Sequence, residues 1–310
     1  MDIVFFGTPE FAVYSLKTII DAGYNVKAVV TSPDRTGGRG NKLIESDVKK
    51  FAKERDLKIL QPEKLRDPDF LEELRSLNTD LFVVIAFRML PEVVWSMPRL
   101  GTFNLHASLL PQLRGAAPIN HAIISGFKTT GVTTFFINHE IDKGEILLSA
   151  STSISDEDDA GTLHDRLMEL GAELVIKTIK GIEEGSLSPS PQPQADCFTP
   201  APKIFKAECK IDFTKAVKNI DRHIRGLSPY PGAWCKLMLA DGRDMEVKIT
   251  KALPAYISLG VEPGLCVKKN KTLLVATGDG ALEILEIQPA GKKPMDIKAF
   301  LAGYAPHKFS

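Results

Sequence analysis

An asparagine and a histidine two residues apart are the side chains of this sequence best suited to chemistry on a carbonyl group. Asn104 and His106 lie in the segment F-N-L-H-A-S-L-L-P, which reads as a strand up to the histidine. Because alternate residues of a strand face the same side, both side chains project together. An amide donor beside an imidazole can polarise a carbonyl and stabilise the oxyanion formed when it is attacked. The plainer alternative is that both residues only cap the edge of a sheet.

A carboxylate farther along the chain could complete this group. Asp142 lies in I-D-K-G-E-I, before a glycine turn between two segments that read as strands, 132–137 and 145–154. Turn chemistry alone accounts for an aspartate in this position. If the turn folds back beside His106, the carboxylate would also orient the imidazole, favour its protonated form and relay protons through water.

The elements that must position these side chains alternate between strand and helix in the first part of the chain. Strands are predicted at residues 3–6, 26–30, 57–60, 81–86 and 102–106. Helices are predicted at 10–20, after a Ser46 cap, at 119–124 and at 162–184. This alternation predicts an α/β domain with an open, mostly parallel sheet and helices on both faces. Such sheets bind ligands at the carboxyl ends of their strands, which is where Asn104 and His106 lie.

A change of composition marks the end of this first domain. Residues 186–202 contain five prolines, which fix φ and block helix formation, so an extended connector is expected. Beyond it, one helix at 213–226 and short strands separated by Asp-Gly or Gly turns predict a small β-barrel. We therefore divide the chain into a catalytic domain at 1–185, a Pro-rich linker at 186–204 and a second domain at 205–310.

Composition excludes several classes of protein. The chain has 310 residues, of which 44% are hydrophobic and 25% charged, and these values exclude a disordered or collagen-like chain. Its four cysteines form no C-x-x-C pair and have no histidine cluster nearby, so neither a disulfide framework nor a metal site is expected. A reducing cytoplasm is the expected location, and no membrane association is expected.

The net charge of zero hides an asymmetry along the chain. Residues 205–310 hold 17 Lys and Arg against 11 Asp and Glu, and the residues before them have the opposite balance. A basic second domain is typical of a protein that binds a polyanion. An ordinary solvated surface would have the same composition, so the asymmetry alone does not decide between the two.

Several motifs together resemble the methionyl-tRNA formyltransferases. They occur in the right order along nearly the whole chain, as G-T-P-E-F-A (7–12), P-D-R-T-G-G-R-G-N-K-L (33–43), N-L-H-A-S-L-L-P-Q-L-R-G-A-A-P-I (104–119), I-D-K-G-E-I (141–146), P-Y-P-G-A-W (229–234) and Q-P-A-G-K-K-P-M (288–295). The resemblance implies a Rossmann-like formyltransferase domain followed by a smaller OB-like barrel. It also implies transfer of the formyl group of 10-formyltetrahydrofolate, as co-substrate, to the α-amino group of methionine on initiator tRNA.

The resemblance also assigns residues to these roles. Asn104, His106 and Asp142 match the catalytic residues of the family. Residues implied to bind folate are Ser108, Leu109, Leu110 and Pro111, with Phe87 and Met89 at the exit of the 81–86 strand. There the chain departs from its relatives, which often carry a small, Gly-containing segment where this sequence has Arg88 and Met89.

Two regions are expected to bind tRNA. The loop 33–43 carries Arg35, Arg39 and Lys42 among three glycines, and by resemblance it enters the acceptor stem, with Arg39 the principal residue. Without the resemblance, an ordinary surface loop would explain it equally well. In the second domain the candidates are Lys206, Lys210, Lys292 and Lys293, although each alone could be a solvated lysine.

Three other functions compete with this one. The first is a folate-dependent formyltransferase that acts on an amino-sugar nucleotide, a class that by resemblance lacks the P-D-R-x-x-G-R-G loop. The second acts on glycinamide ribonucleotide, but those relatives lack the second domain. The third is a catalytically silent RNA-binding protein, against which the intact Asn104, His106 and Asp142 argue. A dinucleotide site is not expected, because G-x-G-x-x-G is absent. A monomer is expected.

Overall fold

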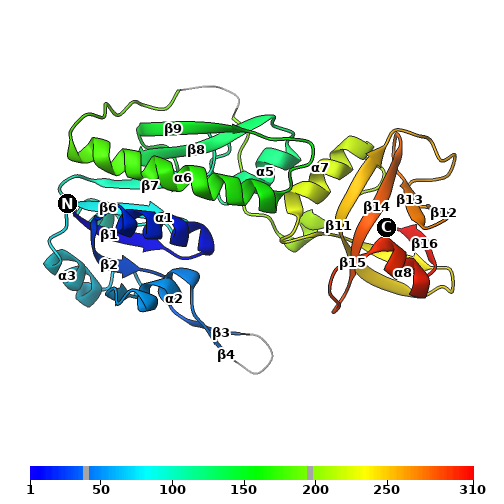
Figure 1. The fold of residues 1–310 in the computed structure, drawn as a ribbon, viewed down its shortest axis with the longest axis horizontal. Coiled ribbons are helices and arrows are strands. Elements are labelled where there is room, and N and C mark those ends of the chain that lie inside the picture. Colours follow the sequence, from blue (N-terminus) through cyan, green and yellow to red (C-terminus); the bar gives the residue numbers. More distant parts are fainter. Residues whose placement is uncertain (38–41, 194–197) are drawn as a thin grey trace. The chain divides into compact units, whose positions relative to one another are not determined.

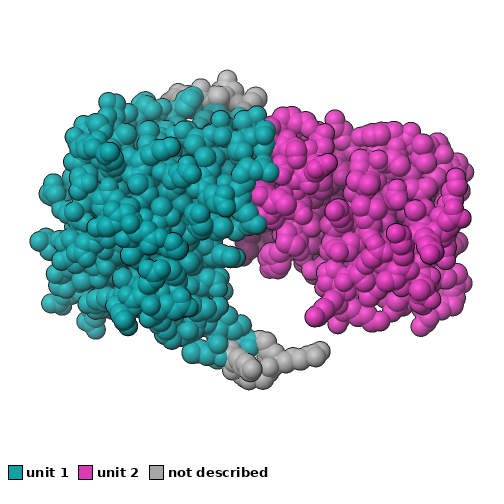
Figure 2. All heavy atoms as spheres, in the orientation of Figure 1, with its two compact units in different colours: residues 1–115, 129–153, 164–200 teal, residues 116–128, 154–163, 201–310 magenta. Residues whose placement is uncertain are grey.

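The computed structural model describes residues 1–37, 42–193 and 198–310. Contacts between residues divide the chain into two compact units, which Figure 2 colours teal and magenta. Unit 1 comprises residues 1–115, 129–153 and 164–200, and unit 2 comprises residues 116–128, 154–163 and 201–310. The domain boundaries predicted from composition differ from this division by contacts, and as functional domains they stay a prediction.

Unit 1 contains the predicted mostly parallel sheet (Figure 1). Its strand order is β5-β2-β1-β6-β7-β8-β9. The strands are β1 (Asp2–Gly7), β2 (Asn25–Val30), β5 (Ile59–Leu60), β6 (Leu81–Ile85), β7 (Thr102–His106), β8 (Thr129–Phe136) and β9 (Ile146–Ser153). The pairs from β5 through to β7 are parallel, whereas β8 is antiparallel to both β7 and β9. The Rossmann-like prediction is thereby confirmed.

Both faces of this sheet are buried. The helices of unit 1 are α1 (Glu10–Asp21), α2 (Asp47–Glu54), α3 (Pro68–Ser76), α4 (Glu92–Trp95) and α6 (Ala160–Glu183). On one face, alternate residues such as Val84 of β6 pack with Phe70 of α3 and Val94 of α4. On the other face α6 crosses β7, where a Cβ on Gly171 would lie 2.7 Å from Leu105. Glycine at this position allows helix and strand to approach closely.

The segment predicted as a glycine- and arginine-rich loop is partly ordered. Arg35–Gly37 (β3) and Lys42–Ile44 (β4) pair as an antiparallel hairpin. The helix cap predicted at Ser46 is confirmed, since its Oγ accepts the Lys49 N–H at 3.0 Å at the start of α2. Composition alone did not reveal that side chains outside the hairpin, those of Lys49 and Gln61, anchor its base.

Unit 2 contains an antiparallel, nearly closed barrel, and the OB-like prediction is confirmed. Its strand order is β12-β13-β14-β11-β10-β16, with β15 beside β14, and a bridge between Leu265 and Lys308 brings the two ends of the order together. The strands are β10 (Ala233–Leu239), β11 (Asp244–Ala255), β12 (Cys266–Lys269), β13 (Thr272–Ala276), β14 (Ala281–Pro289), β15 (Met295–Asp296) and β16 (Pro306–Phe309). The helices are α5 (Pro118–Ile124), α7 (Val217–Leu227), α8 (Ile297–Gly303) and the 3-10 turn η1 (Lys206–Cys209).

Helix α5 belongs to unit 2 because it packs on α7. Asn120 donates from Nδ2 to the carbonyl oxygen of Gly226 at 2.7 Å, and a Cβ on Gly226 would lie 2.5 Å from Ile124. Residues 154–163 are attached to the same helix, since Arg225 donates to the Asp158 carbonyl oxygen at 2.7 Å. These contacts explain why two segments before residue 186 are grouped with the barrel.

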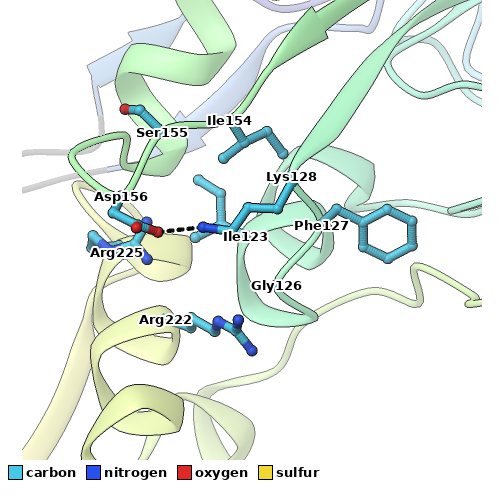
Figure 3. Close-up of a pocket in the computed structure, with 9 residues that line it drawn as sticks. All are labelled: Ile123, Gly126, Phe127, Lys128, Ile154, Ser155, Asp156, Arg222 and Arg225. Atoms are coloured by element: carbon cyan, nitrogen blue, oxygen red, sulfur yellow. Dashed lines mark hydrogen bonds and ion pairs between the residues drawn. The ribbon is translucent and has the colours of Figure 1, made fainter.

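A small pocket lies among these segments (Figure 3). Its volume is about 10 Å³, close to that of one water molecule. Lys128 in its wall pairs with Asp156 at 2.6 Å, and Arg225 is bonded to Asp221 at 2.9 Å. The guanidinium of Arg222 lies against Gly126, where a Cβ would come within 2.3 Å of it. We interpret this pocket as a packing junction of unit 2.

Two expectations from composition concern membrane-spanning helices and disulfide bonds. Among residues 1–37, 42–193 and 198–310, no helix is long and apolar enough to span a membrane. Cys209, Cys235 and Cys266 are free thiols, and Cys197 lies outside the described residues.

The half-buried His223 of α7 makes the stability of unit 2 depend on pH. Desolvation lowers the pKa of its imidazole, and among the described residues its Nε2 has no hydrogen-bond partner. Below the ordinary histidine pKa of about 6.5 the unfolded chain binds a proton that the folded unit does not, so stability falls with falling pH. We expect His223→Gln to flatten the decline in unfolding free energy between neutral and mildly acidic pH, measured by denaturant titration.

The matched control is the exposed His307, also in unit 2. His307→Gln should keep the wild-type pH profile. Parallel profiles for wild type and His223→Gln would contradict this interpretation of the half-buried imidazole.

Candidate active site

The two side chains predicted from the strand pattern lie on one face at the carboxyl end of β7. Asn104 is opposite Val84 of β6 and Phe135 of β8, and His106 is opposite Thr133 of β8. Asn104 is half-buried, whereas His106 is only 7% exposed. Since Val84 faces the core under α3 and α4, both site residues point to that face and not toward α6.

Both ring nitrogens of His106 face a defined oxygen. Nε2 lies 2.9 Å from the carbonyl oxygen of Leu113, and a carbonyl oxygen can only accept, so Nε2 carries the proton. Nδ1 lies 3.9 Å from Oδ2 of Asp142, too far for a direct hydrogen bond but close enough for an ion pair once the ring is protonated. In the neutral ring the nitrogen without a proton is therefore Nδ1, on the side of the carboxylate.

Asp142 is held in place by its backbone and its side chain. Its φ is +55°, in the left-handed region that aspartate and asparagine tolerate better than most residues. Its Oδ2 accepts the Gly115 N–H at 2.9 Å. Gln192 donates to the Asp142 and Gly144 carbonyl oxygens at 2.8 and 2.9 Å, and Arg114 also donates to the former at 3.1 Å. The turn lies beside His106, which is the arrangement in which the carboxylate can orient the imidazole.

The loop after β7 is fixed by hydrogen bonds to β8. Thr133 donates from Oγ1 to the Ser108 carbonyl oxygen at 2.7 Å and accepts the Leu110 N–H at 3.2 Å. Ser108 is buried, and its hydroxyl donates to the Gln112 carbonyl oxygen at 2.6 Å. Of the residues predicted to bind folate here, Ser108 and Leu110 are buried and Leu109 and Pro111 are half-buried. Their role stays a prediction.

The exit of β6 lies beside this loop, because β6 and β7 pair in parallel. A pocket of about 290 Å³ opens there, lined by Leu65, Arg66, Arg88, Met89, Leu90 and Pro91. Met89 is 65% exposed, whereas the Phe87 ring packs on Phe6 at 5.7 Å. The Arg88 guanidinium donates to the carbonyl oxygens of Pro62 and Glu63, so the residue that departs from the family pattern anchors this wall.

The residues predicted to bind tRNA are spread over both units. Arg35 is exposed on β3 and Lys42 lies on β4, whereas Arg39 lies outside the described residues. The four predicted lysines of unit 2 are all exposed, namely Lys206, Lys210, Lys292 and Lys293. Lys206 is paired with Glu246 at 3.0 Å and Lys292 donates to the Tyr304 hydroxyl at 2.8 Å. None of these contacts tests their role.

Three supporting residues were missed in the sequence. Gln192 and Arg114 hold the Asp142 turn, and Thr133 shapes the loop after β7. Gln192 lies in a Pro-rich segment that reads only as a connector, so no local signal pointed to it. Thr133 belongs to a strand that was predicted, but its hydroxyl bonds depend on the pairing of β7 with β8. In the described residues no cluster of His, Cys, Asp and Glu could hold a metal ion.

The turn that carries Asp142 has no room for a side chain at Gly144. A Cβ on Gly144 would lie 1.6 Å from the Phe136 carbonyl oxygen, so the turn must move to accommodate it. We expect Gly144→Ala to lower the unfolding free energy by about 1–3 kcal/mol, measured by denaturant titration. Gly303→Ala, where a Cβ meets open space, is the control and should be nearly neutral. A Gly144→Ala protein as stable as the wild type would contradict the close contact.

Comparison with known proteins identifies the family. Residues 1–179 match the family model described as "Formyl transferase", and residues 203–305 match "Formyl transferase, C-terminal domain". The methionyl-tRNA formyltransferase of Phocaeicola vulgatus is 53% identical over 308 residues, covering 97% of this chain and 95% of the relative. The one from Bacteroides fragilis is 49% identical over 308 residues, covering 97% and 94%.

A solved structure shares the fold. It is a sugar 3N-formyl transferase, WlaRD, crystallised with dTDP and 5-N-formyl-THF, with a TM-score of 0.67 and 21% identity over 94% of this chain and 99% of that one. That likeness concerns the fold, whereas the relatives about 50% identical over nearly the full length decide the family. The chain belongs to the methionyl-tRNA formyltransferase family.

Proposed function

We propose that this protein transfers the formyl group of 10-formyltetrahydrofolate to the α-amino group of methionine on initiator methionyl-tRNA. The observation that carries the proposal is the placing of Asn104, His106 and Asp142 around one end of β7, with Nδ1 of His106 3.9 Å from the Asp142 carboxylate. Nearly full-length similarity to methionyl-tRNA formyltransferases supports the same acceptor. A cytoplasmic, monomeric enzyme is part of this proposal.

In the chemistry we propose, the neutral amine attacks the formyl carbon and a tetrahedral oxyanion forms. Asn104 donates to this oxyanion from its amide, and a protonated His106 donates from Nδ1. Asp142 stabilises the imidazolium and accepts, through water, the proton that leaves the attacking amine. The bond between the formyl carbon and the folate nitrogen then breaks, and that nitrogen takes up a proton.

We propose that folate binds between the loop after β7 and the exit of β6. The pocket of about 290 Å³ has an apolar wall from Leu65, Met89, Leu90 and Pro91, which is suited to a flat ring system. Met89 is exposed at the pocket and would contact the ligand directly. Phe87 packs into the core behind it and would shape the wall instead.

The chemistry of Asn104, His106 and Asp142 suits any small amine, so other parts of the chain must select the acceptor. Two features favour tRNA. Residues 35–44 contain three basic and no acidic residues, and the second domain carries an excess of basic side chains. A polyanionic acceptor would be held by such groups through its phosphates. An amino-sugar nucleotide carries far fewer phosphates.

The acceptor can be identified by comparing the kcat/KM values of candidate acceptors. Purified protein with 10-formyltetrahydrofolate should formylate methionyl-initiator tRNA with a much higher kcat/KM than free glycinamide ribonucleotide or an amino-sugar nucleotide. Asp142→Asn keeps the side-chain size and tolerates the left-handed backbone, so it serves as the catalytic control. We expect it to slow the reaction by about 10²-fold or more, because the charge beside the donor is lost.

Two results would contradict the proposal. Faster formylation of the amino-sugar nucleotide than of the charged tRNA would favour the alternative acceptor. An Asp142→Asn protein with the wild-type rate would remove the carboxylate from the mechanism.

A further inference from the structure

The β3–β4 hairpin must be held by contacts outside itself. In the described part of the chain its two strands pair with each other as a separate two-stranded sheet. Figure 1 shows them extending from the α2 end of unit 1, away from the seven-stranded sheet. Because an isolated two-stranded hairpin is marginally stable in water, its orientation depends on what anchors its base.

Two carboxylates lie at that base. The hairpin register pairs Arg35 with Ile44, and one further step places Asp34 opposite Glu45. Their side chains are only 17% and 24% exposed. Like charges directly opposite each other destabilise a pair of strands, so the base needs a cation between them.

Lys49 of α2 supplies this cation. Its Nζ lies 2.5 Å from Asp34 Oδ2 and 3.3 Å from Glu45 Oε1, and its side chain is only 12% exposed. Hydrogen bonds from Lys49 and then Gln61 hold the pKa of Asp34 below its usual range, and bonds from Lys53 and Lys49 lower the pKa of Glu45. One ammonium therefore joins the residue before β3 to the residue after β4.

The backbone of Lys49 and the carboxylate that it pairs with are also held by other residues. The Lys49 N–H donates to the Ser46 cap at 3.0 Å, and the Ser46 hydroxyl is 2.7 Å from that of Thr31, directly after β2. Gln61, directly after β5, donates to the Ser32 carbonyl oxygen at 2.8 Å and to Asp34 Oδ1 at 2.9 Å. The hairpin base is thus connected to the carboxyl edge of the same sheet whose β7 carries Asn104 and His106.

The basic residues of the hairpin make its anchored base relevant to a negatively charged acceptor. The segment between the two carboxylates holds Arg35, Arg39 and Lys42 and no acidic residue. With Lys49 in place, the carboxylates at the base are largely neutralised, so these three basic residues set the charge of the segment. Without Lys49, Glu45 would keep its pair with Lys53, but Asp34 would lose its ion pair and no ammonium would join the two ends of the hairpin base. The uncompensated Asp34 carboxylate would then repel both Glu45 and a polyanion, and the base would open.

We propose that Lys49 is a positioning residue for the tRNA acceptor, because it clamps the base of the β3–β4 hairpin and fixes the direction in which the hairpin meets the nucleic acid. In the part of the chain that the structure describes, the ion pairs of Lys49 are with Asp34 and Glu45 and not with the Asn104–His106–Asp142 group. The inference rests on the proposed function, since it assigns to the hairpin a part in holding the tRNA acceptor.

The test compares Lys49→Met, which keeps the length of the side chain and removes its charge, with Lys49→Arg, which can still bridge two carboxylates. Lys50→Met is the matched control, because Lys50 lies on the same helix, is largely exposed and pairs only with Asp47 among the described residues. Hydrogen exchange should show faster exchange of the β3 and β4 amides in Lys49→Met, but not in Lys49→Arg or Lys50→Met. The thermal midpoint should stay near that of the wild type in all three.

The kinetic readout uses methionyl-initiator tRNA. Misplacement of a substrate by about 1 Å can cost up to about 100-fold, so we expect Lys49→Met to lower kcat/KM for the charged tRNA at least about tenfold. Affinity for tetrahydrofolate should change less than about twofold, since the pocket at the β6 exit is intact. Lys49→Arg should recover most of the loss, which a general structural defect would not allow.

Two results would overturn the proposal. Unchanged exchange of the hairpin amides in Lys49→Met would show that no clamp exists. Faster exchange with wild-type kcat/KM would show that the clamp does not position the acceptor. Wild-type protein inactive on charged tRNA would instead reject the proposed function, whereas the exchange data would still report on the clamp. If Lys49→Met does not fold, Asp34→Asn provides the same comparison from the other side of the ion pair.

Discussion

The hydrogen bond between Nε2 of His106 and the carbonyl oxygen of Leu113 constrains the whole candidate site. It fixes which ring nitrogen carries the proton and directs the other nitrogen to Asp142. Leu113 accepts this bond from a left-handed backbone with φ of +60°, which costs a non-glycine residue about 1–2 kcal/mol. Burial of its side chain and a bond from its N–H to the Thr199 carbonyl oxygen at 2.8 Å offset that cost.

The remaining contacts in unit 1 keep this geometry. Thr133 fixes the start of the loop that leads to Leu113, and Gln192 and Arg114 fix the turn that carries Asp142. Gly144 allows that turn to lie against Phe136. The reacting groups therefore lie on strands and tightly bonded turns, which suits catalysis by preorganised donors. The hairpin that we assign to the acceptor is anchored separately, through Lys49, at another part of the same sheet.

Much of unit 1 follows from sequence pattern because its strands are short apolar runs separated by helix signals. The strand at 102–106 and the Ser46 cap were predicted at their observed positions, since each depends on neighbouring residues only. Asn104 and His106 share a face for the same local reason. The approach of Asp142 to His106 is a tertiary contact, so spacing alone left it open, and the family resemblance supported it.

Other features could not be predicted because they depend on residues far apart in the chain. The contacts of Gln192 cross 50 residues, and those of Asn120 with Gly226 cross 106, so no local pattern contains them. The glycine and arginine content of the segment 35–44 predicts a loop, whereas Arg35–Gly37 pairs with Lys42–Ile44. Lys49 and Gln61, which anchor this pair through Asp34, lie outside the segment. The packing of α5 on α7 likewise joins distant segments, so the change of composition at residue 186 gives no sign of it.

The position of the proton on the neutral His106 ring tests directly whether its Nε2 donates to the Leu113 carbonyl oxygen. Nitrogen NMR of the protein with ¹⁵N-labelled histidine, in alkaline solution where imidazoles are neutral, distinguishes a protonated from an unprotonated ring nitrogen, and His106→Gln identifies the resonance. We expect a proton on Nε2 and none on Nδ1. A neutral His106 with its proton on Nδ1 would contradict this geometry, because Nε2 could not then donate to the Leu113 carbonyl oxygen.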